Sequence, residues 1–114
     1  MTEALRIAQQ YFDAWGRHDA AGIGAAFAEG GTYSDPQAPA LTGEAIAAYA
    51  GQLWEAFPDL SLEIVGATLA CDGLVAAQWR MKGTNTGPFR GLPPSGRSVS
   101  LPGADFIQHR AASR

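Results

Sequence analysis

The sequence contains a single cysteine, Cys71, and only two histidines, His18 and His109. One thiol cannot form a disulfide within the chain, and so few thiol and imidazole groups exclude the common zinc sites. No apolar run is long enough to span a bilayer, and the N-terminus lacks the cationic start and unbroken apolar segment of a signal peptide. We therefore expect a soluble, cytoplasmic protein with no membrane partner.

Positive charge is also scarce, because 8 Lys and Arg residues stand against 11 Asp and Glu residues, which gives a formal net charge of -3. Such a chain lacks the positive electrostatic potential that attracts the phosphates of a nucleic-acid backbone, and we expect no nucleic-acid partner. With 114 residues, 46% of them hydrophobic, the chain can bury one core but not two. Residues 1–114 are thus expected to form a single domain.

Apolar residues at helical spacing predict three helices in the first half of the chain. The first covers residues 3–17 with Thr2 as its N-cap, and a short second helix follows Asp19. The aromatic residues of the first helix are interpreted as core. His18 lies between these helices, and we interpret it as a solvated residue rather than a catalytic base.

The third predicted helix covers residues 43–57, with Thr42 as its cap and Pro58 as its stop. Before it, the residues T-Y-S-D-P are predicted to form an extended segment. Two roles are possible for Asp35 in this segment. It either makes an Asx turn ahead of Pro36, or it faces a pocket together with Tyr33, because side chains two residues apart on a strand point to the same side.

From Asp59 onward the apolar period changes to two, which predicts antiparallel strands. One strand follows Asp59, a turn at Cys71–Gly73 leads into a second, and a third follows a Gly- and Pro-rich loop at about residues 83–97. Helices followed by a strand meander predict an α+β cone, in which the N-terminal helices pack on a curved antiparallel sheet.

The last strand carries the candidate catalytic group. Counting by two from Val99 places Asp105 on the apolar face, where desolvation would raise its pKa and suit it to acid/base chemistry. The alternative is a bulge at Pro102–Gly103, which would turn Phe106 inward and leave Asp105 exposed.

The stretch G-T-N-T-G-P-F-R-G-L-P-P-S-G-R, followed by G-A-D-F, resembles the SnoaL-like polyketide cyclase and ester cyclase branch of the nuclear transport factor 2-like superfamily. The early Y-S-D-P and T-G-E segments fit the same pattern, so the resemblance extends from the first helix to about Gln108. It implies an α+β barrel or cone, commonly a homodimer, with no metal and no organic cofactor. In relatives an aspartate is the acid/base of an intramolecular aldol ring closure, and Asp105 matches it. Some relatives carry His where this chain has Asn85.

These observations favour a cyclase that closes a ring in a small apolar carbonyl substrate. Asp105 would transfer the proton, and Asn85 would donate a hydrogen bond to the enolate or carbonyl oxygen. One alternative is a non-catalytic module that binds an apolar ligand or dimerises; others are an isomerase or an epoxide hydrolase on the same cone. A second carboxyl or tyrosine near Asp105 would favour the isomerase. The residues expected to line the site are Trp15, Tyr33, Asp35, Trp54, Phe57, Trp79, Met81 and Phe89.

The chain ends in the polar segment H-R-A-A-S-R, residues 109–114. Relatives usually continue from the Asp-containing strand into one more long strand. We therefore expect this tail to be atypical, the last strand to be missing, and the preceding strand to form an uncovered edge.

Overall fold

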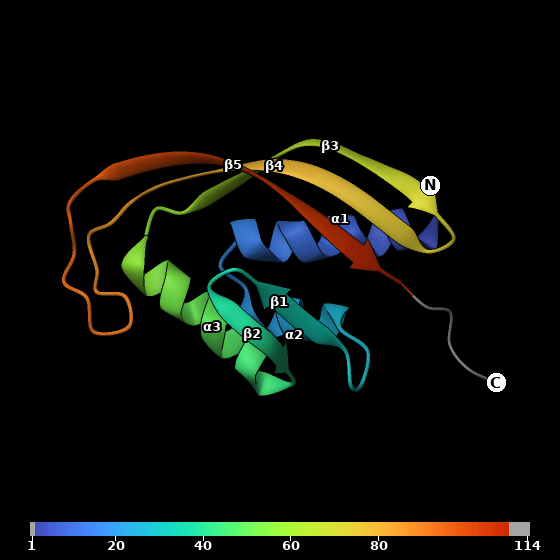
Figure 1. Cartoon of the computed structure of the whole chain (residues 1–114), viewed down its shortest axis with the longest axis horizontal. Coiled ribbons are helices and arrows are strands. Elements are labelled where there is room, and N and C mark those ends of the chain that lie inside the picture. Colours follow the sequence, from blue (N-terminus) through green and yellow to red (C-terminus); the bar gives the residue numbers. More distant parts are fainter. Residues whose placement is uncertain (1, 110–114) are drawn as a thin grey trace.

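The computed structural model describes residues 2–109, so the predicted tail beyond His109 lies outside the described residues. Its elements follow the order α1 (Glu3–Gly16), α2 (Ala20–Ala26), β1 (Thr32–Asp35), β2 (Ala38–Thr42), α3 (Glu44–Ala56), β3 (Ser61–Cys71), β4 (Leu74–Thr84) and β5 (Ser98–Gln108). The three long strands arch over the helices (Figure 1).

Two predicted helix caps are confirmed and one is wrong. Thr2 Oγ1 accepts a hydrogen bond from the Leu5 N–H at 3.2 Å, and the Asp19 carboxylate accepts one from the Gly22 N–H at 2.9 Å. Thr42 instead ends β2, where it pairs with Thr32. Because Thr42 is extended in this ladder, Gly43 with a φ of +57° makes the turn into α3, without a side-chain cap bond.

The extended segment before α3 is a two-stranded hairpin, in which β1 pairs with β2 in antiparallel register. Only one extended piece was predicted here, and β2 was missed. The turn lies at Pro36 and Gln37, where the sequence predicted no reversal of the chain. The hairpin places Asp35 opposite Ala38, and Ala38 is buried.

The main sheet has the strand order β3–β4–β5 and is antiparallel throughout. The pairing of β4 with β5 runs without a shift from Leu74 opposite Gln108 to Thr84 opposite Ser98. Within the described residues, β3 and β5 are the two edges of this sheet, and it does not close into a barrel. The predicted α+β class, with N-terminal helices on an antiparallel sheet, is confirmed.

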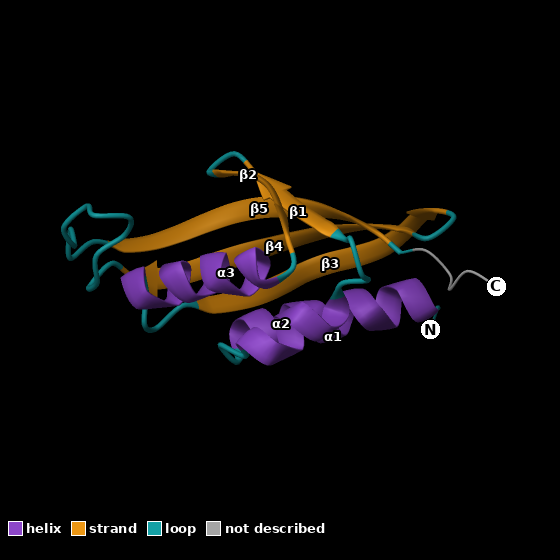
Figure 2. Cartoon of the chain, turned by 90° about the horizontal axis from the view of Figure 1, so that it is seen from below, coloured by secondary structure: helices purple, strands orange, loops and turns teal. Residues whose placement is uncertain are grey.

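The helices cover one face of the sheet, and Figure 2 shows that face from below, with the β1–β2 hairpin on the β5 side and α1 on the β3 side. Small residues of α1, Ala4, Ala8 and Ala14, are almost fully buried, so the helix lies close to the sheet. Val75 and Ala77 of β4 complete the core beneath them. In the described part of the chain, no helix is long and apolar enough to cross a membrane.

Candidate active site

Asp105 lies on the helix-covered face of the sheet. The regular pairing of β5 leaves no bulge at Pro102, and Asp105 stands opposite Ala77, which is 2% exposed. Phe106, the next residue, is 75% exposed and points the other way. The strand alternation therefore placed Asp105 correctly, and the bulged alternative does not occur. The catalytic role of Asp105 remains a prediction.

The surroundings of Asp105 raise its pKa above the ordinary carboxyl range, chiefly through desolvation. The Trp79 side chain acts in the opposite direction, and the negative charge of Asp35 adds to the rise. A partly buried carboxyl of this kind is closer to neutrality near pH 7 than an exposed one. It is consequently better suited to taking and returning a proton.

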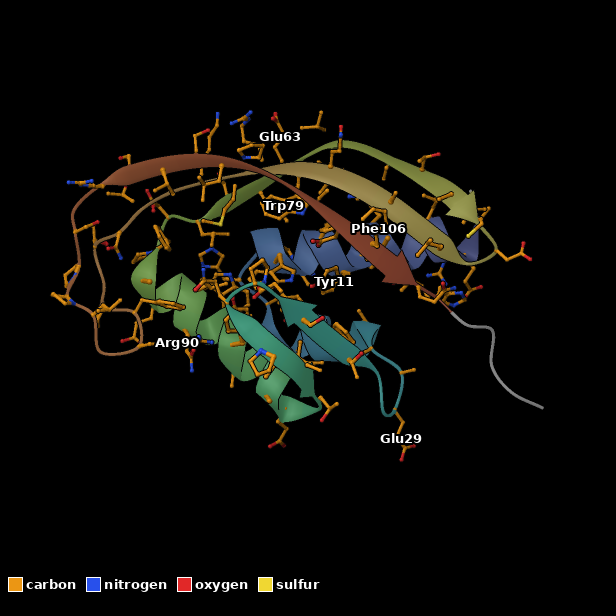
Figure 3. The ribbon with its side chains drawn as sticks, in the orientation of Figure 1. Tyr11, Glu29, Glu63, Trp79, Arg90 and Phe106 are labelled. Carbon is orange, nitrogen blue, oxygen red and sulfur yellow. The ribbon has the colours of Figure 1, made fainter. Side chains whose placement is uncertain are left out.

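Trp79 owes its position beside Asp105 to a glycine. A Cβ atom at Gly103 would lie 2.3 Å from the Trp79 indole. The ring can therefore lie across β5 at this position because glycine has no side chain. Figure 3 shows Trp79 pointing from the sheet toward α1, whereas Glu63 points away from the helices. The Trp79 Nε1 atom is buried and has no hydrogen-bond partner in the described part of the chain.

Asp35 is the centre of a hydrogen-bond network at the hairpin. Its Oδ2 atom accepts from the Tyr33 hydroxyl at 2.6 Å and from the Tyr49 hydroxyl at 2.8 Å, while its Oδ1 atom accepts from the Gln37 N–H at 2.8 Å. The Asx turn is therefore confirmed, since one oxygen makes it, and the other oxygen binds the two tyrosines. A role of Asp35 in a pocket stays a prediction. Tyr33 and Asp35 do share one side of β1, as expected.

These bonds keep Asp35 ionised and the two phenols protonated. Burial tends to raise the pKa of Asp35, but the hydrogen bonds from Tyr33, Tyr49 and the main chain outweigh it, and the pKa is lowered. Burial, followed by the bond to Asp35, raises the pKa of both Tyr33 and Tyr49. Asp35 and Asp105 are thus two carboxyls whose pKa values are shifted in opposite directions.

Tyr11 is a residue that the sequence interpretation assigned to the core. It is 6% exposed, and burial raises its pKa, with smaller contributions from the charges of Asp105 and Asp35. The Trp15 indole acts in the opposite direction. An indole N–H can act only as a donor, so Trp15 does not accept the Tyr11 proton. An aromatic stripe on a helix gave no signal that the charges of two carboxylates act on one of its members.

Asn85 has a structural position that argues against its predicted catalytic role. Its Nδ2 atom donates to the carbonyl oxygens of Ala56 at 3.1 Å and Gly87 at 2.9 Å, and its Oδ1 atom accepts from the Ser95 N–H at 2.8 Å. Both amide protons are therefore used. Asn85 also follows Ala77, the partner of Asp105, by eight residues, or about 26 Å along an extended strand. It does not share a site with Asp105.

Of the other predicted lining residues, Trp15 packs against Tyr11 at 6.5 Å between ring centroids, whereas Trp54, Phe57 and Phe89 contact other parts of the molecule. Trp15 and Trp54 pack edge to face at 5.7 Å between centroids, and His18 stacks on Trp54 at 5.0 Å, with its Nε2 atom 2.9 Å from the Leu60 carbonyl oxygen. His18 is thus a packing residue. Phe57 lies against Gly83 and Phe89 against Arg90, while Met81 is opposite Leu101, two strand positions from Trp79. Of the predicted lining residues, Trp79 and Asp35 affect the pKa of Asp105. Tyr33 is linked to Asp35 by a hydrogen bond.

Asp105 lines neither of two open depressions on the surface. One of about 430 Å³ crosses the sheet at Gln78, Arg80 and Pro102, with Trp79 and Gly103 also in its lining, and one of about 390 Å³ lies between α2 and α3. In residues 2–109, no group of three or more His, Cys, Asp and Glu side chains is arranged to hold a metal ion. The chemistry of the inner site therefore rests on carboxyl, phenol and indole groups.

Residues 8–112 match the family model of the SnoaL-like domain. The chain belongs to the SnoaL-like domain family. Among solved structures, this SnoaL-like domain is similar to a candidate SnoaL-like polyketide cyclase from Jannaschia sp. CCS1, with 25% identity and a TM-score of 0.82 over 94% of this chain and 76% of that one. No curated protein matches the chain.

Two further solved structures support the fold of this SnoaL-like domain. IdmH, a candidate polyketide cyclase from Streptomyces antibioticus, is 18% identical with a TM-score of 0.77, over 96% of this chain and 84% of that one. A protein with a ketosteroid isomerase-like fold from Catenulispora acidiphila is 20% identical with a TM-score of 0.76, over 91% and 75%.

Proposed function

We propose that this SnoaL-like domain is a cofactor-independent cyclase that closes a ring in a small apolar carbonyl substrate by an intramolecular aldol reaction. The observation that supports it most is the partly buried carboxyl of Asp105 on the helix-covered face, where its charge acts on the Tyr11 phenol and the Trp79 indole acts on its pKa. A non-catalytic module would have no need for a desolvated carboxyl, which lowers the stability of the fold when it ionises.

In the proposed reaction, the Asp105 carboxylate takes a proton from a carbon between two carbonyl groups. The enolate carbon then attacks a second carbonyl carbon of the same molecule, a C–C bond forms, and the new alkoxide takes the proton back from Asp105. No atom is gained or lost. Holding both ends of the substrate together contributes about 7 to 11 kcal/mol to such a step.

Tyr11 replaces Asn85 as the proposed donor to the enolate oxygen. Its pKa is raised so that it stays protonated, and the charge of Asp105 contributes to this rise. A phenol O–H placed where negative charge develops stabilises the enolate more than the neutral ketone.

A second candidate function is a double-bond isomerisation through a dienolate. The discriminating feature expected for it was a second carboxyl or a tyrosine within reach of Asp105, and it is supported by the electrostatic effects of Asp35 on Asp105 and of Asp105 on Tyr11. A carboxyl that moves a proton between two carbons of an enone, assisted by a phenol, needs this combination.

The test is proton exchange at the activated carbon of an aryl 1,3-diketone in D₂O, followed by NMR. Asp105→Asn is expected to lower the enzyme-dependent exchange rate about 100-fold or more, because a positioned acid/base contributes at least that much. Asp72→Asn, which changes an exposed carboxyl in the β3–β4 turn, is the matched control and should leave the rate unchanged.

Full exchange activity in Asp105→Asn would rule out the proposed role of this residue. The same variants assayed with a β,γ-unsaturated ketone separate the two candidates, because conversion to the conjugated ketone favours the isomerase. We also propose that the protein acts in the cytoplasm and that it is a homodimer, of which only the dimer was implied by the resemblance.

A further inference from the structure

The loop between β4 and β5 contains a tight turn whose backbone conformation is unfavourable for Arg90. Phe89 and Leu92 exchange two main-chain hydrogen bonds, of 3.1 and 2.9 Å, and Arg90 and Gly91 lie between them with φ angles of +50° and +82°. Positive φ at both central positions is typical of a type I′ turn, for which Asn-Gly is the preferred pair. An arginine at the first position is strained, because its Cβ crowds the main chain.

The Arg90 side chain makes contacts that offset this strain. Its Nη1 atom donates to the Gln37 carbonyl oxygen at 2.8 Å in the β1–β2 turn, and its Nε atom donates to Gln52 Oε1 at 3.3 Å on α3. The guanidinium carbon lies 5.2 Å from the centroid of the Tyr49 ring and 5.1 Å from that of Phe89. Figure 3 shows Arg90 beside α3, so one side chain joins the loop, the helix and the hairpin.

Two of the groups that Arg90 contacts also bind Asp35. The residue whose carbonyl oxygen Arg90 binds, Gln37, donates its own N–H to Asp35 Oδ1, and the ring under the guanidinium, Tyr49, donates its hydroxyl to Asp35 Oδ2. The other side-chain donor, Tyr33, lies on β1 itself. Arg90 therefore holds together the two donors that reach Asp35 from the turn and from α3.

We propose that Arg90 is a positioning residue, which fixes the Asp35 carboxylate by holding the β1–β2 turn and Tyr49 in one arrangement. The inference rests on the proposed function, because the placement of Asp35 affects a reaction only if Asp105 transfers protons. The titratable and charged groups around Asp35 are Tyr33 on β1, Tyr49 on α3, Tyr11 on α1, Asp105 on β5 and Arg90 in the loop.

Arg90→Asn is the most informative variant. Asparagine suits the turn better than arginine, so the loop should keep its main-chain conformation while the side-chain contacts to Gln37, Gln52 and Tyr49 are lost. Arg90→Lys keeps the positive charge but not the planar fork that reaches two acceptors at once. Arg97→Asn is the matched control, because Arg97 lies in the same loop and its hydrogen bonds are made by its main chain.

The measurement is NMR titration of the Asp35 and Asp105 carboxyl carbons, together with the exchange rate of the Tyr49 hydroxyl proton. In both Arg90 variants, the pKa of Asp35 is expected to rise by about 0.5 or more toward its ordinary value, and the Tyr49 proton should exchange faster. Tyr33 should keep its bond to Asp35. Arg97→Asn should match the wild type in every respect.

An unchanged Asp35 titration in Arg90→Asn would overturn the proposal, and so would an equal change in Arg97→Asn. Wild-type behaviour of Arg90→Lys would also overturn it, since charge alone would then suffice. The proposed function fails by a different result, an Asp105 that titrates near 3.9 in the wild-type protein, whatever the Arg90 variants do.

Discussion

At the scale of single residues, Asp35 and Asp105 differ in how they make stability depend on pH. The folded-state pKa of Asp35 is lowered, so its carboxylate stabilises the fold above the unfolded value of about 3.9, and this contribution is lost as the pH falls through the folded pKa. The folded-state pKa of Asp105 is raised. Its protonated form therefore favours folding at low pH, and that contribution is lost as the pH rises through the folded pKa.

Substitution of the two residues should consequently have opposite effects. At neutral pH, Asp35→Asn is expected to lower the free energy of unfolding by about 2 kcal/mol or more, because hydrogen bonds to a charged group are lost. Asp105→Asn should raise it, since an ionised group leaves a partly buried site. The Asp35 difference should shrink as the pH falls from about 3.9 toward the lowered folded-state pKa, whereas the Asp105 difference should shrink at higher pH, between its raised folded-state pKa and about 3.9. Urea unfolding over a pH series tests this, and a neutral-pH loss of stability in Asp105→Asn would contradict it.

Single residues also differ in how well the sequence predicts their positions and contacts. Asp105 could be placed by counting, because a one-residue slip of β5 would have put its apolar side chains in solvent. Tyr11 was correctly assigned to the core, but its proposed role and that of Arg90 could not be predicted. The proposed role of Tyr11 depends on a strand more than 90 residues later in the sequence, and that of Arg90 on a turn about 50 residues earlier. No local pattern contains these pairings.

At the scale of elements, the β4–β5 loop is held to the end of α3 by a few polar contacts. Asn85 joins Ala56, Gly87 and Ser95, and the Gly87 N–H donates to the Ala56 carbonyl oxygen at 3.2 Å. A Cβ atom on Gly87 would lie 1.9 Å from the Glu55 carbonyl oxygen, so only glycine fits there. The loop motif that carries the family resemblance thus has a structural function in anchoring the loop.

Asn85→Ala is expected to destabilise the protein by about 3 kcal/mol, because three side-chain hydrogen bonds contribute about 1 kcal/mol each. The loop should also become more susceptible to trypsin at Arg90 and Arg97. Ser98→Ala removes one exposed contact to Thr84, of 3.2 Å, and serves as a control expected to lose less than about 1 kcal/mol. Equal stability of the two variants in urea unfolding would show that Asn85 does not anchor the loop.

The positions of elements were predictable where apolar residues recur at the period of the element, as for α1 and the three long strands, although β3 is exposed from Val65 onward. The β1–β2 hairpin was only partly predictable, since Pro36 indicated an extended segment without indicating its reversal. Thr42 is a suitable cap by residue type, but its pairing with Thr32 fixes it in a strand. Tertiary pairing therefore decided this helix boundary against local preference.

At the scale of the whole molecule, the sheet face away from the helices carries apolar side chains. Phe106 on β5 is 75% exposed and Val65 on β3 is 62% exposed, and the open depression of about 430 Å³ crosses the strands between β3 and β5. Exposed apolar surface of this kind is common at protein–protein contacts. It is consistent with the proposed homodimer, with a second copy of the chain as the occupant of this face.

Phe106→Ser is therefore expected to shift the protein from dimer toward monomer in sedimentation velocity runs over a range of concentrations, because the largest apolar side chain of the face is removed. Leu92→Ser is the matched control, since Leu92 is 65% exposed but lies in the loop rather than on the sheet. Its sedimentation should equal that of the wild type. A wild-type chain that is monomeric at every concentration would refute the dimer, and an equal effect of the two variants would place the contact away from the sheet. Neither substitution alters the inner face that carries Asp105, so the exchange activity of any monomer would show whether one copy of the site is sufficient.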